Sequence, residues 1–126
     1  MNSKGQAKIF IVEDNFMFSY VLDSVLKDYG NFKITTCATG EECIQMLGNN
    51  PDIVIMDYNL GSGMNGLETL KAIRAKKPKL PVIILSGQND IKIAAELFQA
   101  GAYDYIEKKG QKETLDKLIN SIVNAN

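Results

Sequence analysis

The segment IVIMDYNLGSGMNG (53–66) decides how this chain folds, because it joins a buried strand to a glycine-rich turn through one acidic residue. Four consecutive apolar residues lead directly to Asp57, and glycine then occupies positions 61, 63 and 66. A short, continuously apolar run is typical of a strand that is covered on both faces in a parallel sheet. Burying an unpaired carboxylate is costly. The sequence therefore predicts that charged partners lie close to the Asp57 carboxylate.

Short apolar segments alternate with segments of helical periodicity along the chain. Five segments are predicted to be strands: KIFIVED (8–14), FKITTCAT (32–39), DIVIMD (52–57), LPVIILS (80–86) and AYDYIEK (102–108). Apolar residues at helical spacing predict five helices. Their apolar positions are Phe18, Val21, Leu22, Val25, Leu26 and Tyr29; Ile44 and Leu47; Leu67, Leu70 and Ile73; Ile93, Ala94 and Leu97; and Leu115, Leu118, Ile119, Ile122 and Val123.

This alternation predicts an α/β fold: one doubly wound parallel sheet of five strands with helices on both faces. The continuously apolar first, third and fourth strands belong in the middle of the sheet, and the second and fifth at its edges. The resulting strand order is 2-1-3-4-5, the flavodoxin-like arrangement. We expect a single domain over residues 1–126, with its core at about 8–123.

Composition restricts the chemistry. The chain carries 14 basic and 15 acidic residues, a net charge of −1, and this balance does not favour capture by nucleic acid or by a membrane surface. The basic cluster at Lys71, Arg74, Lys76, Lys77 and Lys79 is predicted to be a solvated face. No apolar run is long enough for a signal peptide or a membrane span, so we predict a cytoplasmic protein.

The cysteine and histidine content limits which metal, redox and catalytic sites this chain can form. Cys37 and Cys43 lack the C-x-x-C spacing of a zinc or redox site and are predicted to be thiols in the core. Histidine is absent, which excludes imidazole catalysis and imidazole metal ligands in this chain.

Five polar residues are predicted to meet at one edge of the sheet. Glu13 and Asp14 end the first strand, Asp57 the third, Ser86 the fourth and Lys108 the fifth. In this fold functional groups gather beyond the carboxyl ends of the strands. Three clustered carboxylates repel one another unless a hard cation neutralises them, so we expect Mg²⁺ (or Mn²⁺) as cofactor.

Asp57 is the predicted nucleophile of this group. An aspartate carboxylate can attack phosphorus and form an aspartyl phosphate. The ammonium group of Lys108, the hydroxyl group of Ser86 and the metal would then surround the new phosphoryl group.

These residues and their chain order resemble a response-regulator receiver domain, the phosphoacceptor of bacterial two-component signalling, of the chemotaxis-regulator-like kind. VEDN (12–15) supplies the acidic pair, IMD (55–57) the phosphoacceptor, LSG (85–87) the switch hydroxyl, and GAYDYIEK (101–108) the switch aromatic Tyr105 and the lysine. The resemblance runs from about residue 8 to residue 123. It also implies that the backbone carbonyl of Asn59 completes the metal ligands.

The resemblance implies a signalling module, which acts as an enzyme only in promoting its own phosphorylation and dephosphorylation. Asp57 would take a phosphoryl group from a sensor histidine kinase, a phosphotransfer protein or a small phosphodonor. Ser86 would then move toward the phosphate and Tyr105 would turn inward, altering the face made by the fourth helix, fifth strand and fifth helix. A downstream protein target would bind that face, while Asn59 and Gln88 tune the phosphate lifetime.

Two positions depart from the family pattern. Gly61 stands where the family usually has proline, in a loop that is one residue longer, and we predict an altered and more mobile loop. Lys109 also replaces a proline that often follows a cis bond. Because a non-proline cis bond costs roughly 2.5 to 4 kcal/mol, we predict a trans Lys108–Lys109 bond.

Alternatives stay open at this point. GSGMNG (61–66) matches the dinucleotide fingerprint G-x-G-x-x-G, but the next strand ends in ILSG without the acid that would hold a ribose. A Mg²⁺-dependent phosphohydrolase with Asp57 as nucleophile would need a second acid at the position of Asn59. No output domain follows Val123, so we expect either a protein that works alone or a piece of a longer regulator.

Overall fold

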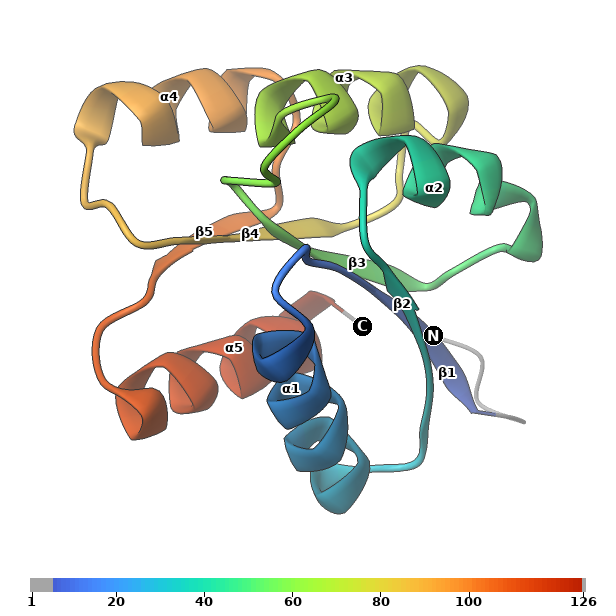
Figure 1. Cartoon of the computed structure of the whole chain (residues 1–126), viewed down its shortest axis with the longest axis vertical. Helices are drawn as coiled ribbons and strands as arrows, with labels where there is room; N and C mark the ends of the chain where they lie inside the picture. Colours follow the sequence, from blue (N-terminus) through green and yellow to red (C-terminus); the bar gives the residue numbers. More distant parts are fainter. Residues whose placement is uncertain (1–5, 126) are drawn as a thin grey trace.

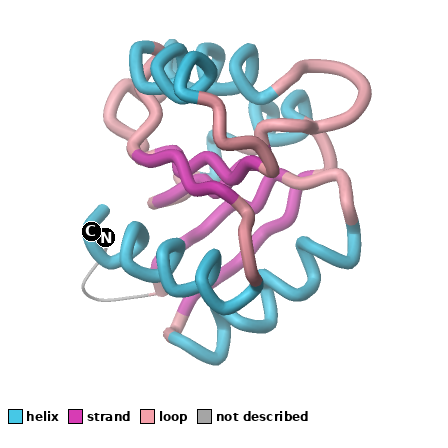
Figure 2. The backbone as a smooth tube through the Cα atoms, turned by 90° about the vertical axis from the view of Figure 1, so that its left-hand side faces the viewer, coloured by secondary structure: helices cyan, strands magenta, loops and turns pink. Residues whose placement is uncertain are grey.

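A computed structural model describes residues 6–125. The expected core at 8–123 lies inside this range, whereas residues 1–5 and 126 of the predicted domain lie outside the described residues. The chain forms three layers, with a parallel sheet between two layers of helices (Figure 1). Helices α2 (Gly40–Gln45), α3 (Gly66–Lys76) and α4 (Ile91–Gln99) cover one face, and α1 (Phe16–Tyr29) and α5 (Gln111–Ala125) cover the other. Figure 2 shows the same layers from the side.

The sheet has the predicted order, β2-β1-β3-β4-β5, with every neighbouring pair parallel. The strands are β1 (Ala7–Val12), β2 (Phe32–Cys37), β3 (Ile53–Asp57), β4 (Val82–Ser86) and β5 (Asp104–Glu107). β3 and β4 are buried along their whole length, as expected of strands covered on both faces. The predicted positions of the central and edge strands are confirmed.

Residues 6–125 form five α-helices, and in four of them the preceding residue caps the first turn with its side chain. They are α1 (Phe16–Tyr29), α2 (Gly40–Gln45), α3 (Gly66–Lys76), α4 (Ile91–Gln99) and α5 (Gln111–Ala125), with a short 3₁₀ turn, η1 (Leu47–Asn49). Asn15, Thr39, Asn65 and Asp90 each accept a hydrogen bond from a backbone N–H in the first turn of the helix that follows. Among residues 6–125 no helix is long and apolar enough to cross a membrane.

Alternate residues of the strands build two separate cores. Phe10, Val54 and Ile84 face α2, α3 and α4, while Ile9, Ile55 and Ile83 face α1 and α5. Side chains of a strand point to opposite faces in turn, so a strand with apolar residues at every position supplies both cores. Cys37 and Cys43 are free thiols buried in the first of these cores, as predicted.

The structure corrects several details at the ends of elements. Leu47 belongs to η1 and not to a helix with Ile44, a natural ambiguity because a spacing of three residues also fits a 3₁₀ turn. Tyr29 and Val123 are exposed rather than in the core. Tyr29 stacks on Phe32 at the surface, and Val123 lies at the edge of its apolar stripe, about 100° around the helix from Ile122.

The basic cluster is not entirely a solvated face. The guanidinium group of Arg74 is half-buried and donates hydrogen bonds to the carbonyl oxygens of Lys77, at 2.8 Å, and Gly101, at 2.6 Å. Arg74 therefore ties the end of α3 to the turn that precedes β5. The isolated sequence could not show this, because Gly101 lies 27 residues away along the chain.

Candidate functional site

The carboxyl ends of β1, β3, β4 and β5 bring the predicted site residues to one edge of the sheet. The ladder continues one residue past three of the strands: the backbone N–H groups of Glu13, Tyr58 and Lys108 donate to Cys37, Leu85 and Ser86. Glu13 and Asp14 follow β1 rather than end it, and Lys108 follows β5. These backbone hydrogen bonds fix the Cα positions from which the side chains of Glu13 and Lys108 extend into the site.

Glu13, Asp14 and Asp57 form one acidic cluster. Each contributes a carboxylate oxygen, and the three oxygens lie within 4.8 Å of one another. Glu13 and Asp57 are buried, with exposed fractions of 5% and 8%, while Asp14 is open to solvent. Oε1 of Glu13 is buried and accepts no hydrogen bond from any group within residues 6–125. Clustered carboxylate oxygens with one orphaned acceptor fit a divalent cation such as Mg²⁺, which prefers oxygen ligands and keeps several waters.

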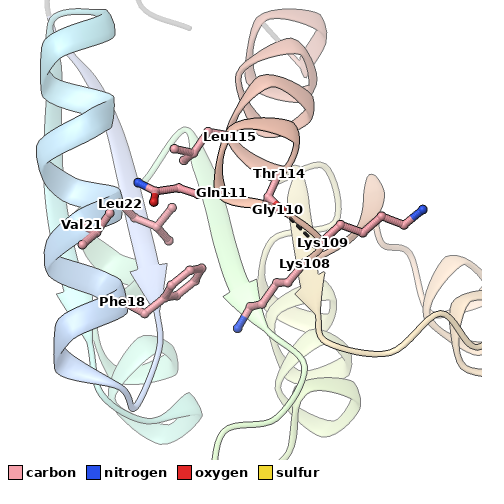
Figure 3. A pocket seen from close by; sticks show the side chains of 9 residues that line it. All are labelled: Phe18, Val21, Leu22, Lys108, Lys109, Gly110, Gln111, Thr114 and Leu115. Carbon is pink, nitrogen blue, oxygen red and sulfur yellow. Dashed lines mark hydrogen bonds between the residues drawn. The ribbon is translucent and has the colours of Figure 1, made fainter.

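Lys108 supplies the positive charge of the site. Its Nζ atom lies 3.0 Å from Oδ2 of Asp57 and 3.6 Å from Oε1 of Glu13. The same atom lies 4.3 Å from the centre of the Phe18 ring, an arrangement that a cation–π interaction stabilises. Figure 3 shows the Lys108 side chain running past Phe18 of α1. Three groups therefore hold one ammonium group in place.

The pKa of Glu13 is raised mainly because its carboxyl group is buried. Burial, followed by repulsion from Asp57, raises its pKa from 4.5 to about 7, although the N–H of Asn15 and the charge of Lys108 act in the opposite direction. The hydrogen bond from Asn15 N to Oε2 of Glu13 measures 3.1 Å. This agrees with the expectation that the three carboxylates do not all ionise readily without a cation.

A mostly apolar pocket of about 260 Å³ lies beside Lys108, between α1 and α5. Phe18, Leu22 and Leu115 line it, and Figure 3 shows these side chains facing one another across the gap. The N–H of Lys109 donates to Oγ1 of Thr114 at 3.0 Å, which fixes the segment between β5 and α5. The Lys108–Lys109 peptide bond is trans, as predicted.

Ser86 and Tyr105 meet at the backbone of Gln88. Oγ of Ser86, which is fully buried, accepts a hydrogen bond from Gln88 N at 3.1 Å. The hydroxyl group of Tyr105 donates to Gln88 O at 2.6 Å. Ser86 follows Leu85, the register partner of Asp57, so its side chain starts one residue beyond Asp57 on the neighbouring strand.

The loop after Asp57 (58–65) uses its glycines in the way that the sequence suggested. Gly61 and Gly63 have positive φ angles of 74° and 84°, which side-chain-bearing residues rarely adopt. A Cβ atom on Gly61 would lie 2.6 Å from Oδ2 of Asp14. Asn59 N donates to Oδ1 of Asp57 at 3.2 Å. The mobility of this loop stays a prediction.

The same geometry argues against a dinucleotide site. Gly61 and Gly63 each lie against a carboxylate, of Asp14 and Glu41 respectively. A dinucleotide fingerprint instead presents open backbone N–H groups to an anionic pyrophosphate. Two negative charges at this position would repel it.

Two residues of the site were not identified from the sequence. Phe18 was assigned only to an apolar stripe, and nothing near it in the chain indicates that it contacts Lys108. Glu41 was not considered, yet its Oε2 accepts a hydrogen bond from Met64 N at 3.0 Å. Both contacts join distant parts of the chain, so only the folded arrangement reveals them.

Comparison with known proteins agrees with the fold and with this arrangement. The model of the response regulator receiver domain matches residues 9–120. The DNA-binding transcriptional regulator NtrC of Escherichia coli (strain K12) is 35% identical over 101 residues, which cover 79% of this chain and 21% of NtrC. The cell cycle transcriptional regulator CtrA of Caulobacter vibrioides is 30% identical over 118 residues, which cover 92% of this chain and 50% of CtrA.

Solved structures show the same likeness. The receiver domain of NtrX from Brucella abortus superposes with a TM-score of 0.83 at 30% identity, covering 93% of this chain and 96% of that one. The chemotaxis protein CheY4 of Vibrio cholerae gives a TM-score of 0.82 at 26% identity, covering 92% and 98%. This chain therefore spans only a fifth to a half of the two regulators but nearly all of the isolated domains. The chain belongs to the family of response regulator receiver domains of two-component systems.

Proposed function

We propose that Asp57 accepts a phosphoryl group and that this modification switches a protein-binding face of the domain. The observation that carries the proposal is the contact of Asp57 with the Lys108 ammonium group inside a cluster of three carboxylates. A nucleophilic carboxylate, a fixed cation and a set of hard oxygen ligands are the groups that phosphoryl transfer to an aspartate requires.

Glu13, Asp14 and Asp57 would hold Mg²⁺, with the backbone carbonyl of Asn59 as a further ligand. A bound cation would favour ionisation of all three carboxylates, which together with the Lys108 ammonium group would then carry −3 and +1, and one divalent ion would neutralise the remaining −2. When bound, the ion offsets the negative charge on the transferring phosphoryl oxygens.

In the transfer itself, a carboxylate oxygen of Asp57 forms a bond to phosphorus while the donor's bond to phosphorus breaks. With a phosphohistidine donor the leaving imidazole nitrogen keeps the electron pair of the broken P–N bond. With acetyl phosphate the leaving group is acetate. Lys108 and Ser86 then donate hydrogen bonds to the phosphoryl oxygens now attached to Asp57.

Phosphorylation of Asp57 would change the position of Ser86 first and that of Tyr105 in consequence. Movement of the Ser86 hydroxyl group toward the phosphoryl group requires it to leave Gln88 N, and the carbonyl oxygen of Gln88 is the acceptor for Tyr105. The face formed by α4, β5 and α5 would change in consequence. Helix α4 carries the exposed apolar residues Ile91 and Phe98, which a protein partner would cover.

A sensor histidine kinase or a phosphotransfer protein is the proposed donor, and a protein is the proposed downstream target. NtrC is described as a DNA-binding regulator, but this chain matches only 21% of its length. We therefore propose no direct contact of this domain with nucleic acid. The cytoplasmic location expected from the sequence also stays a prediction.

A phosphohydrolase that uses Asp57 is the alternative that the site supports less well. Such an enzyme would place a second acid where Asn59 stands, and an amide cannot protonate a leaving group. Asn59 is exposed, and its backbone N–H is bonded to Asp57.

The two functions are distinguished by incubating the protein with Mg²⁺ and acetyl phosphate, or with beryllofluoride, and measuring the intact mass and the phosphate released. We expect one modified aspartate per chain and no sustained turnover of an external phosphoester. The variant Asp57→Asn should stay unmodified under the same conditions. Sustained turnover of an external phosphoester by the parent protein, beyond the loss of phosphate from Asp57 itself, or undiminished modification of Asp57→Asn, would contradict the proposal.

A further inference from the structure

The second half of the loop between β3 and α3 is held by an acid from another helix. The ends of the loop are fixed by backbone bonds, from Tyr58 N to Leu85 O at 2.8 Å and from Gly66 N to Tyr58 O at 3.1 Å. Between them, Met64 N donates to Oε2 of Glu41, 23 residues away, at 3.0 Å. Glu41 thus connects α2 to the second half of the loop, two residues before α3 begins.

The contact with Glu41 is close and leaves no room for a side chain in the loop. A Cβ atom on Gly63 would lie 2.8 and 2.9 Å from the two carboxylate oxygens of Glu41. Gly63 also has a positive φ of 84°. A residue with a side chain would therefore be strained in its backbone and would push Glu41 away.

Helix α2 offers this carboxylate from a fixed position. Its first residue, Gly40, packs so closely on Oγ1 of Thr69 in α3 that a Cβ atom on Gly40 would overlap it. Thr69 is fully buried, and the same Oγ1 donates to the carbonyl oxygen of Asn65, where the loop ends. The start of α2, the start of α3 and the end of the loop consequently form one rigid corner.

The loop held in this way also carries groups of the phosphorylation site. Asn59 N bonds to Oδ1 of Asp57, and Gly61 lies directly against Oδ2 of Asp14. Leu60 between them is buried in the core beneath α3. A shift of the loop at Gly63 would therefore move the backbone beside two of the three clustered carboxylates.

We propose that Glu41 is a positioning residue for phosphorylation: it holds the glycine-rich loop against α2, so that the backbone at Asn59 and Gly61 stays in place beside the acidic cluster. The inference rests on the proposed function of Asp57 and adds a control on it. Because the bond lies at the surface and joins a carboxylate to one amide, it can open without unfolding the domain.

The test compares Glu41→Ala, which removes the acceptor, with Glu41→Gln, which keeps one. The matched control is Glu42→Ala on the same helix, because the Glu42 carboxylate accepts from Ala38 N and does not touch the loop. Hydrogen exchange at the Met64 amide measures the bond itself, without metal or phosphodonor. In Glu41→Ala this exchange should be about three to ten times faster, and in Glu41→Gln and Glu42→Ala within about twofold of the parent protein.

The second measurement is binding of Mg²⁺, followed by the backbone amide signals of Asp57 and Asn59. Glu41→Ala should bind about three to ten times more weakly, whereas the other two variants should match the parent protein. Unchanged Met64 exchange or unchanged Mg²⁺ affinity in a folded Glu41→Ala variant would overturn the inference, as would equal losses in Glu42→Ala. Failure of the proposed function looks different: Asp57 of the parent protein would not be modified, while the exchange result would stand.

Discussion

The ammonium nitrogen of Lys108 lies 3.0 Å from Oδ2 of Asp57, although 51 residues separate the two along the chain. The contact arises because β3 and β5 flank β4 and because the backbone bond from Lys108 N to Ser86 O extends the ladder past β5. The cation is therefore already beside Asp57, the proposed phosphoacceptor, in the unmodified domain.

Lys108→Met should slow modification of Asp57 by acetyl phosphate about 100-fold, because it removes a fixed donor from the position where charge develops. The measurement is the rate of intact-mass change at saturating Mg²⁺. Lys109→Met is the control, since the Lys109 side chain makes a surface ion pair of 3.9 Å with Glu107 and its backbone bond to Thr114 is kept in the variant. Its rate should stay within about twofold of the parent rate; equal rates for Lys108→Met and the parent protein would contradict the assigned role.

Glu13→Gln should raise the melting temperature of the metal-free protein at neutral pH. The folded-state pKa of Glu13, about 7, lies above its ordinary value of 4.5, so the folded protein holds this proton more tightly than the unfolded chain does. The associated stability is complete below pH 4.5 and is lost as the pH rises to about 7. Glutamine cannot ionise and avoids the loss.

Thermal melts in EDTA at several pH values test this expectation. The difference in melting temperature between Glu13→Gln and the parent protein should grow between pH 4.5 and 7 and then level off. Each kcal/mol of stability corresponds to about 3 to 6 °C in a domain of this size. Mg²⁺ at pH 8 should narrow the gap, since a cation favours the carboxylate. The control Asp116→Asn removes an exposed acid and should show no such pH dependence. A constant difference at all pH values would refute the prediction.

Phe18→Leu should destabilise the domain by about 0.5 to 2 kcal/mol through loss of the cation–π contact with Lys108. Chemical denaturation gives the free energy, and a double-mutant cycle with Lys108→Met should return a coupling of about 0.5 kcal/mol or more. Phe16→Leu, at a side chain 76% exposed, is the comparison and should change stability by less than about 0.5 kcal/mol. Zero coupling in the cycle would show that the contact contributes nothing.

Gly61→Ala should lower both stability and Mg²⁺ affinity. Its left-handed φ of 74° costs an alanine about 1 to 2 kcal/mol, and the new Cβ atom would press on Asp14. Gly48→Ala is the matched change, because Gly48 lies in η1 with a backbone that alanine tolerates and no atom within 4 Å of the added methyl group. That variant should be neutral or slightly stabilised. Comparable losses in both variants would argue against strain at Gly61.

Titration with NAD should reveal no saturable binding, despite the match of residues 61–66 to the dinucleotide fingerprint. Asp14 and Glu41 lie against Gly61 and Gly63, where a pyrophosphate would have to sit. Calorimetry on the parent protein and on Glu41→Gln should give flat titrations. Saturable heats in either would mean that the glycine loop opens into an anion site after all.

The sequence predicted the sheet and the acidic edge because both depend on local patterns. Runs of apolar residues mark strands buried on both faces, and their order in a doubly wound sheet follows from the rules of parallel crossovers. Acidic residues directly after such runs must then gather at one edge. Asp57 and Lys108 were placed together by this argument, and the structure confirms their contact.

The contacts that the sequence did not predict depend on side-chain directions in three dimensions. An apolar stripe on α1 indicates burial for Phe18 but cannot show that its ring faces an ammonium group. Glu41 occupies the first turn of a short helix, where acids are common because they favour the helix dipole, so its type carried no signal. The hydrogen bond from Tyr105 to Gln88 likewise depends on how the segment after β4 turns.

Both hydrogen bonds at Gln88 involve its backbone and neither involves its side chain. Its backbone N–H bonds to Ser86 and its carbonyl oxygen to Tyr105, so the two proposed switch residues are connected through adjacent peptide units. Replacing this glutamine with another residue would therefore keep both hydrogen bonds. With the tuning role that the family resemblance implies for this side chain, a substitution at position 88 would change the lifetime of the phosphoryl group while the connection between Ser86 and Tyr105 stayed the same.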